Sequence, residues 1–334
     1  MVSKVKKTDS EQRKSDHLDL AKKSQTSSDL VESTYYYEPL FFSHPVYPYK
    51  IPVQFLGTHY DYPFWISSMT GGTLEAKSIN TNLAKLCEKY HLGFGLGSCR
   101  SLLESDERMS DFKMRAFLGD RPFYANLGYA QIENLFLSGE LSKITELVKK
   151  LEADGLIIHL NPLQEWFQPG GDRYKKSPID VLPYLFDELS CPMMIKEVGH
   201  GFGPKTLKAL IDLPFKAIEF GAFGGTNFSI LESQRGEVSE FKKPFAYLGH
   251  SAFEMIDIIN QLKPSDKSFI ISGGMSSPLE AQRAYQLLAS PKLIGLAYGF
   301  LAPAREGFES LETYFLNYAE SFVVAKDLLV LKGK

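Results

Sequence analysis

The stretch Gly155–Asp172 reads GLIIHLNPLQEWFQPGGD. It begins with an apolar run and then presents a series of polar side chains before a Pro-Gly-Gly turn. A short run of branched apolar residues that ends in a polar, glycine-containing segment is typical of a buried strand entering a loop. We interpret the polar residues as one wall of an active site, with a solvated loop of no function as the alternative. These residues are His159, Asn161, Gln164, Glu165, Gln168 and Asp172.

The same alternation recurs along the chain and predicts the fold. Apolar, strand-like runs occur at 64–67, 93–96, 123–126, 155–159, 193–197, 217–220, 268–272 and 293–296. Helical patterns occur at 76–90, within 104–117, at 141–151, 179–189, 204–213, 252–262 and 279–288, and within 306–331. Regular alternation of strands and helices predicts an α/β fold, a TIM (β/α)₈ barrel. A doubly wound sheet is the alternative, but the chain has no GxGxxG opening turn.

The sequence before the first predicted strand has a different character. We expect residues 1–62 to form an N-terminal arm and capping segment, and residues 63–334 to form the barrel. The first part of the arm is polar and rich in Lys, Ser and Asp, so we expect much of it to be mobile on its own. Its cluster Arg13, Lys14 and His17 would by itself be a solvated charge cluster. The aromatic, Pro-containing stretch that follows predicts an extended segment or a hairpin.

Composition excludes several classes of protein. The 334 residues are 44% hydrophobic and 23% charged, as in ordinary globular chains, with a net charge of −3. This charge gives no electrostatic basis for binding nucleic acid, and no apolar run approaches the ~18 residues of a membrane span. The basic start lacks the apolar region of a secretory signal. Cys87, Cys99 and Cys191 match no metal spacing and no disulfide framework, so we expect a cytoplasmic protein.

The strand ends carry residues that suit a phosphate ligand. Glycine-containing turns follow the sixth, seventh and eighth predicted strands, where backbone N–H groups can approach an anion closely. Lys196 at the end of a buried strand needs a negative partner. It could be a Schiff-base lysine, a counter-ion to Glu197 or a positive charge beside a cofactor, and the residues alone leave these alternatives open. Glu165 is a candidate Mg²⁺ ligand.

A set of motifs resembles the type 2 isopentenyl-diphosphate isomerases, which are FMN-dependent barrel enzymes. The matching motifs are collinear from Arg13 to about Gly299: RKSDH, SMTGG, GLGSCR, ANLG, HLNPLQEWFQPGGD, KEVGHG, GAFGGTN and SGG. The resemblance implies interconversion of isopentenyl and dimethylallyl diphosphate, in isoprenoid biosynthesis, with reduced FMN and Mg²⁺. It further implies NADPH as the reductant of the flavin and a homo-oligomer, a tetramer or octamer.

The resemblance also assigns roles to individual residues. It implies that FMN is bound by Ser68, Met69, Thr70, Ser98, Asn126, Lys196, Gly221, Thr226, Gly273, Gly274, Ala297 and Tyr298. It implies that the substrate diphosphate is bound by Arg13, Lys14, His17, Ser98 and Arg100. Gln164 would contact the substrate, with His159 as the second catalytic residue, and Glu165 would bind Mg²⁺. The cations suit a diphosphate, because an Arg–phosphate contact can be bidentate.

The chain departs from the family pattern at a few positions, and other functions fit part of it. Cys99, Gly170 and Ser276 stand where Gln, Glu and Arg are common. An FMN barrel of the 2-hydroxy-acid oxidase type would also place a lysine on a strand, but its His-Gly-Gly base motif is matched only in part by Gly249-His250-Ser251. A catalytically silent phosphate-binding barrel is the third alternative. The combination of Arg100, Gln164, Glu165 and Lys196 argues against it.

Overall fold

A computed structural model describes residues 9–68, 70–73, 75–236 and 238–333. The chain divides into two compact units, Met1–Phe42 with Leu328–Lys334, and Ser43–Asp327. In the smaller unit, β1 (Tyr35–Tyr37) pairs antiparallel with β12 (Leu329–Leu331). The helix α1 (Asp9–Leu20) has no buried residue. The aromatic stretch therefore begins with an extended strand whose partner lies at the opposite end of the chain.

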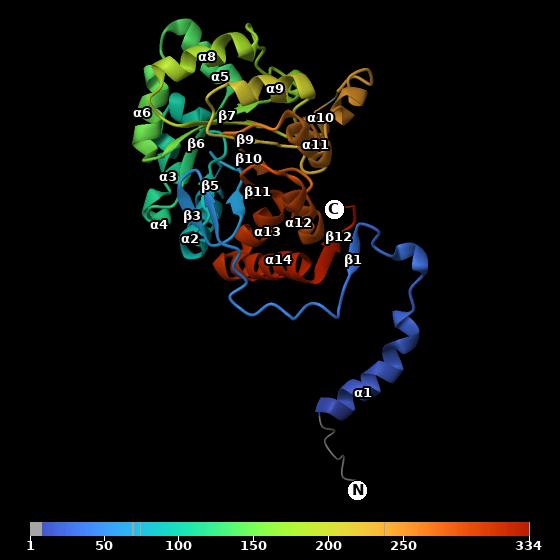
Figure 1. Cartoon of the computed structure of the whole chain (residues 1–334). Helices are drawn as coiled ribbons and strands as arrows, with labels where there is room; N and C mark the ends of the chain where they lie inside the picture. The colour runs from blue at the N-terminus through green and yellow to red at the C-terminus, as the bar shows by residue number, and fades with distance from the viewer. Residues whose placement is uncertain (1–8, 69, 74, 237, 334) are drawn as a thin grey trace. The chain divides into compact units, whose positions relative to one another are not determined.

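The larger unit contains a closed barrel of parallel strands, as the alternation of strands and helices predicted (Figure 1). Neighbouring strands follow sequence order, and β11 pairs with β4 to close the ring. The observed bounds differ from the predicted ones by at most two residues. The strands are β4 Phe64–Ile66, β5 Gly93–Gly95, β6 Phe123–Gly128, β7 Gly155–Leu160, β8 Met193–Glu197, β9 Ala217–Glu219, β10 Ser268–Ile271 and β11 Lys292–Leu296.

Helices surround the barrel (Figure 1). Those at the predicted positions are α2 Ala76–Tyr90, α6 Ser142–Leu151, α8 Pro178–Glu188, α9 Pro204–Asp212, α11 Ala252–Leu262, α12 Pro278–Leu287 and α14 Phe308–Leu328. The segment 104–117 holds only short pieces, α3 Met109–Phe112 and α4 Arg115–Leu118, which begins there. Helices beyond the prediction are α5 Tyr129–Ser138, α7 Pro162–Phe167, α10 Phe228–Arg235 and α13 Tyr298–Glu306. The 3₁₀ turns are η1 Ala21–Ser24, η2 Ser28–Leu30, η3 Arg100–Leu103, η4 Asp106–Arg108 and η5 Lys243–Tyr247. No helix in the described ranges is long and apolar enough to span a membrane.

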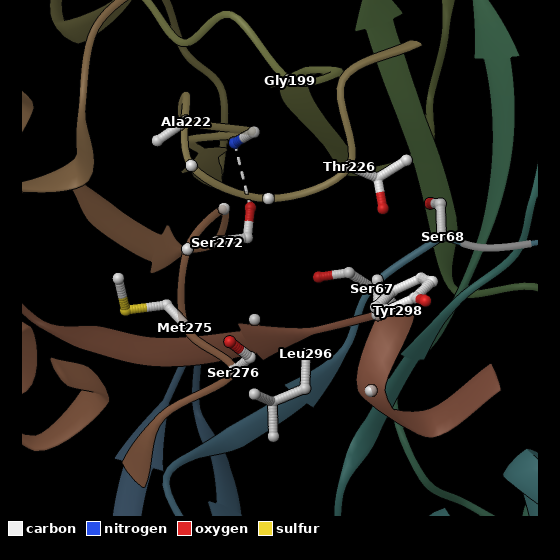
Figure 2. Close-up of a pocket in the computed structure, with 18 of the residues that line it drawn as sticks. Ser67, Ser68, Gly199, Ala222, Thr226, Ser272, Met275, Ser276, Leu296 and Tyr298 are labelled. Carbon is white, nitrogen blue, oxygen red and sulfur yellow. Dashed lines mark hydrogen bonds between the residues drawn. The ribbon is translucent and has the colours of Figure 1, made fainter. Parts of the chain in front are cut away.

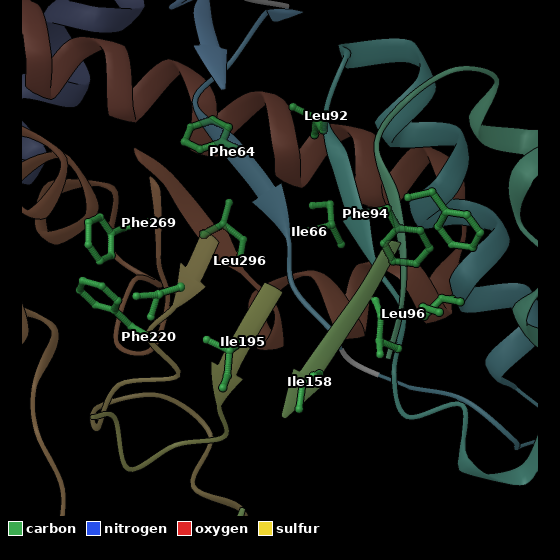
Figure 3. Packing of buried hydrophobic residues seen from close by; sticks show 14 of the residues in the cluster. Phe64, Ile66, Leu92, Phe94, Leu96, Ile158, Ile195, Phe220, Phe269 and Leu296 are labelled. Atoms are coloured by element: carbon green, nitrogen blue, oxygen red, sulfur yellow. The ribbon is translucent and has the colours of Figure 1, made fainter. Parts of the chain in front are cut away.

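Side chains of the strands alternate between two hydrophobic layers. On β4, Trp65 points into the barrel, where a small cluster of buried residues fills the interior. Phe64 and Ile66, its neighbours, belong to the larger cluster between the strands and the helices (Figure 3). This alternation is the period of two that a β-strand imposes, with both faces buried. The barrel interior is thus a packed core rather than a channel.

A hairpin covers the end of the barrel where the strands begin. The strands β2 (Val53–Phe55) and β3 (Thr58–Tyr60) pair antiparallel across the turn Leu56–Gly57. Both turn residues have positive φ, as the favoured two-residue hairpin turns require. Phe55 and Tyr60 are buried in the interior cluster together with Trp65. The hairpin therefore leaves the opposite end, where the strands finish, for a binding site.

Replacing Phe315 with Ala should destabilise the protein strongly. Phe315 on α14 is fully buried, and its ring centroid lies 5.1 Å from that of Tyr62 and 4.5 Å from that of Tyr90. Removing a buried aromatic ring leaves a cavity and should lower the free energy of unfolding by about 3–5 kcal/mol, measured by urea denaturation. The matched control is Phe241→Ala, at a side chain that is 90% exposed. Equal losses in the two variants would contradict the assigned packing.

Candidate functional site

A cavity of about 440 Å³ lies at the end of the barrel where the strands finish (Figure 2). Its walls come from the residues that directly follow β4, β9 and β10 and from the last residues of β8 and β11. Figure 2 shows the hydroxyl groups of Ser67, Thr226 and Ser276 directed into it. Segments far apart in the sequence meet here because all parallel strands end at the same rim.

Most of the residues expected to bind the cofactor line this cavity. They are Ser68, Lys196, Gly221, Thr226, Gly273, Gly274, Ala297 and Tyr298. Asn126 does not line the cavity but contacts a residue that does, since its Nδ2 donates to Ser68 Oγ at 2.7 Å. Thr70 and Ser98 are not among the lining residues, and Met69 lies outside the described residues.

The glycine turns after β9 and β10 pack backbone against backbone. Gly273 has a φ of 88°, and a Cβ atom there would collide with the backbone of Ala222. A Cβ atom on Gly225 would lie 3.1 Å from Gly273 Cα. A side chain is therefore excluded at Gly273 and disfavoured at Gly225, so main-chain atoms line the cavity at these two positions.

The helix α13 begins at the cavity with an open N-terminus. Its N-cap residue is Ala297, which makes no side-chain capping hydrogen bond. The first N–H groups of a helix have no partner within the helix, and the helix dipole is positive at this end. An anion in the cavity would satisfy these groups, in the way that phosphates bind at helix N-termini.

Buried polar groups also face the cavity. Lys196 and Glu219 are 7% and 2% exposed and are register partners on β8 and β9. Within the described part of the chain, Glu219 Oε2 and Ser67 Oγ are buried without a hydrogen-bond partner. Because buried polar atoms are normally satisfied, these two atoms point to a ligand with polar groups of its own. Glu219 Oε2 calls for a hydrogen-bond donor on the ligand, while Lys196 and the N-terminus of α13 suit a negatively charged group on it.

The contacts of Lys196 bear on the three roles that the sequence left open for it, and they argue against that of counter-ion to the Glu197 carboxylate. Its Nζ donates to the carbonyl oxygen of Glu197 at 2.7 Å, not to the carboxylate. The Glu197 carboxylate instead accepts backbone N–H groups of Gly199 and Gly201 at 2.7 and 2.9 Å. The carboxylate therefore anchors the loop after β8, and the ammonium of Lys196 lies at the cavity wall beside whatever binds there.

His159 is held in one neutral tautomer. Its Nδ1 lies 2.7 Å from Asn126 Oδ1, while Asn126 Nδ2 donates to Ser68 Oγ and to the Leu96 carbonyl. Nδ1 must donate to the amide oxygen, which leaves a lone pair on Nε2. Burial, together with the charge of Lys196, lowers the pKa of His159 to about 3. At neutral pH, Nε2 can accept a hydrogen bond but has no proton to give.

Gln164 and Glu165 lie on α7, directly after β7. Asn161 precedes this helix, and its Nδ2 donates to Gln164 Oε1 at 3.2 Å and to Glu165 Oε1 at 3.0 Å. Glu165 is buried, and its second oxygen accepts the backbone N–H of Asp172 at 2.8 Å. Among the described residues, no group of three or more His, Cys, Asp or Glu could hold a metal ion. A single Glu suits Mg²⁺ only where a ligand phosphate and water complete the shell.

The residues after β5 alternate between the core and the surface. Ser98 and Arg100 are exposed, whereas Cys99 between them is fully buried. Burial raises the pKa of the Cys99 thiol to about 12, so it carries no thiolate at neutral pH. The Arg100 Nη1 donates to Asp172 Oδ2 at 2.9 Å. Ser98 and Arg100 therefore remain available for binding, and Cys99 is a packing residue.

The remaining predicted residues belong to the smaller unit. Arg13, Lys14 and His17 lie on α1, where Arg13 and His17 share one face because they are four residues apart. Ser67 and Glu219, whose buried polar atoms face the cavity, were not predicted from the sequence as site residues. A charged residue inside the apolar run AIEF was the available signal for Glu219.

Two curated relatives from Rickettsia match most of the chain. It is 32% identical over 302 residues to the isopentenyl-diphosphate delta-isomerase of Rickettsia africae, with 88% of this chain and 86% of the relative covered. It is 32% identical over 309 residues to the protein of the same name from Rickettsia typhi, with 90% and 87% covered. No protein-family model matches.

Solved structures with a similar fold include two flavoprotein variants. One is a mandelate oxidase with a monooxide FMN adduct, at a TM-score of 0.56 and 10% identity, covering 88% of this chain and 82% of that one. The other is a flavocytochrome b2 with sulfite bound, at a TM-score of 0.59 and 16% identity, covering 88% and 72%. At such identities the likeness shows a shared barrel fold, not a shared activity.

The depressed pKa of His159 predicts how stability changes with pH. In the unfolded chain the imidazole takes up a proton as the pH falls through about 6.5, whereas in the folded protein it does so only near 3. Its contribution to stability is therefore complete above about pH 6.5 and declines as the pH falls toward 3. Between pH 7 and 4.5, urea denaturation should show a loss about 2 kcal/mol larger in the parent than in His159→Asn. An NMR titration of His159 with a midpoint near 6.5 would contradict the burial argument.

Proposed function

The chain belongs to the isopentenyl-diphosphate delta-isomerase family, and we propose that it is a flavin-dependent, type 2 member. It interconverts isopentenyl and dimethylallyl diphosphate with reduced FMN and Mg²⁺, in isoprenoid biosynthesis, and NADPH serves to reduce the flavin. The observation that carries this proposal is the cavity at the barrel rim, which is lined both by the open N-terminus of α13 and by the buried Lys196. This combination suits a phosphate-bearing, anionic cofactor.

The chain's own residues supply the groups that FMN binding requires. The turns at Gly225 and Gly273 and the first N–H groups of α13 would hold its phosphate. Ser68 and Thr226 add hydroxyl groups to the same cavity. The positive charge of Lys196 would offset the negative charge of the reduced flavin.

The substrate diphosphate would bind beside the cofactor. Arg100 and Ser98 are exposed after β5, and Gln164, whose Oε1 accepts from Asn161 Nδ2, has an amide N–H₂ group that can donate. Glu165 would bind Mg²⁺ together with diphosphate oxygens, which supply the ligands that a single carboxylate cannot. The substrate would thus carry part of the metal site with it.

The reaction requires a proton to be added to one carbon of an alkene and removed from another. His159 is not the acid, because its low pKa leaves no proton on Nε2 at neutral pH. When bound, reduced FMN would supply the acid–base chemistry for this proton exchange. The protein residues hold the diphosphate, exclude water from the cavity and stabilise the positive charge that develops. His159 Nε2 and Gln164 are the polar groups proposed to fix the substrate.

The competing oxidase reading has less support. An oxidase base would need a histidine directed at the flavin. His200 Nδ1 donates to the Leu248 carbonyl and its Nε2 lies 2.7 Å from Ser229 Oγ, so both nitrogens are engaged. His250 Nδ1 pairs with Glu254 at 2.8 Å. Neither histidine lines the cavity.

We extend the proposal to the arm and to the assembly. Arg13, Lys14 and His17 would add charge-assisted contacts to the diphosphate, as the RKSDH motif implies. The enzyme would act in the cytoplasm as a homo-oligomer, a tetramer or octamer.

The direct test is turnover of isopentenyl diphosphate under anaerobic conditions. Purified protein with FMN, Mg²⁺ and NADPH should form dimethylallyl diphosphate until the two isomers reach equilibrium. Omitting FMN, withholding reductant or adding EDTA should each abolish turnover, since each removes a component that the proposal requires. Activity that persists without flavin would overturn the proposed mechanism, and oxidation of a 2-hydroxy acid would favour the oxidase.

Replacing Lys196 with Met should weaken flavin binding while the barrel stays folded. The change keeps the aliphatic length of a buried side chain and removes its charge. Losing a charge-assisted contact should reduce FMN affinity by about tenfold or more, measured by flavin fluorescence. The matched control is Lys205→Met, at an exposed lysine on α9. Parent-like flavin affinity and turnover in Lys196→Met would remove this residue from the site.

A further inference from the structure

Asp172 lies at the rim where the strands finish. The family resemblance assigns it no role, and it is not among the residues that line the cavity. We propose that Asp172 is a positioning residue, which fixes one end of the Arg100 guanidinium so that its remaining donors face the substrate diphosphate. This inference rests on the proposed function, since it concerns the same anion site. The residue pair is separated by most of two βα units in the sequence and is brought together only by the fold.

The Asp172 carboxylate is held from two sides. Its Oδ2 accepts from Arg100 Nη1 at 2.9 Å and from Gln131 Nε2 at 2.9 Å. Gln131 is 9% exposed and lies on α5, directly after β6. A buried amide donor therefore fixes the acceptor, and the acceptor in turn fixes the half-exposed guanidinium.

The backbone of Asp172 is fixed as well. Its N–H donates to Glu165 Oε2 at 2.8 Å, and Glu165 is buried beside Asn161. A Cβ atom on the preceding Gly171 would collide with the Glu165 carbonyl, so this approach is close. One residue thus links the proposed diphosphate ligand, Arg100, to the proposed metal ligand, Glu165.

The hydrogen bonding of Arg100 indicates that Asp172 orients the guanidinium and does not compete with the diphosphate for it. Within the described residues, only Nη1 of Arg100 makes a hydrogen bond, so Nε and Nη2 are free for a bidentate contact with phosphate oxygens. Asp172 therefore occupies one end of the guanidinium and leaves the opposite edge open. Because the pair is partly exposed, it is weak enough not to exclude a multiply charged ligand.

The experiment combines two single variants with their double variant. Asp172→Asn keeps the shape of the side chain and removes its charge, and Arg100→Ala removes the group through which Asp172 acts. Two quantities are measured on the FMN-loaded protein: KM and kcat for isopentenyl diphosphate, and the affinity for inorganic pyrophosphate with Mg²⁺ by calorimetry. Asp172→Asn should raise KM and weaken pyrophosphate binding by about fivefold, with little change in kcat.

The double variant separates positioning from a general structural effect. If Asp172 acts through Arg100, adding Asp172→Asn to Arg100→Ala should have no further effect on either affinity. If Asp172 had only a structural role, the losses of affinity in the two single variants would add in the double variant, and the flavin content would fall. Asp106→Asn is the matched control, since Asp106 forms a 2.9 Å surface ion pair with Lys150 and does not line the cavity.

The possible outcomes distinguish this inference from the proposed function. Parent-like KM and pyrophosphate affinity in Asp172→Asn, with parent turnover intact, would overturn the positioning role and leave the isomerase standing. Tighter binding in that variant would also overturn it, because Asp172 would then compete with the ligand. If the parent binds pyrophosphate in an Asp172-dependent way but does not isomerise the substrate, the positioning role holds and the proposed function fails. If the parent neither binds nor turns over, both fail.

Discussion

The pairing of β11 with β4 is the contact on which the rest of the structure depends. It closes the barrel, with Ile294 opposite Phe64 and the Ser67 N–H donating to the Leu296 carbonyl at 2.9 Å. Closure removes both sheet edges and brings all strand ends to one rim. It also sets the residues after β4 beside the start of α13. An open sheet of the same strands would leave the hydroxyl groups and the helix N-terminus at opposite edges.

Much of the fold could be predicted from the sequence, because strands buried on both faces read as continuous apolar runs. The prediction for Met193–Glu197 matches the observed bounds of β8. The prediction of helices was less accurate where local sequence signals are poor. The helix α13 begins at Tyr298 after the N-cap residue Ala297, which makes no capping hydrogen bond with its side chain, and the segment 104–117 breaks into pieces of a single turn. Neither feature has a sequence signature, since both depend on tertiary contacts.

The candidate site could be predicted residue by residue only through the family resemblance, and its electrostatics could not be predicted from the chain alone. The tautomer of His159 follows from Asn126, which lies on another strand. The low pKa of His159 follows from burial and from Lys196, again on a neighbouring strand. Distances between residues so far apart in sequence are a property of the closed barrel. The motifs therefore nominate candidate residues, while the fold determines their surroundings and orientation.

The hairpin β2–β3 has a consequence for the order of events at the site. Because Phe55 and Tyr60 are buried in the interior at the starting end of the barrel, a ligand would enter the cavity from the rim where the strands finish. A ligand that occupies the deeper part must arrive before one that covers it and depart after it. Product must also leave by the route that substrate used. If cofactor and substrate share the rim as their entrance, the hairpin on the far side of the barrel would thus impose an order in which they bind and leave.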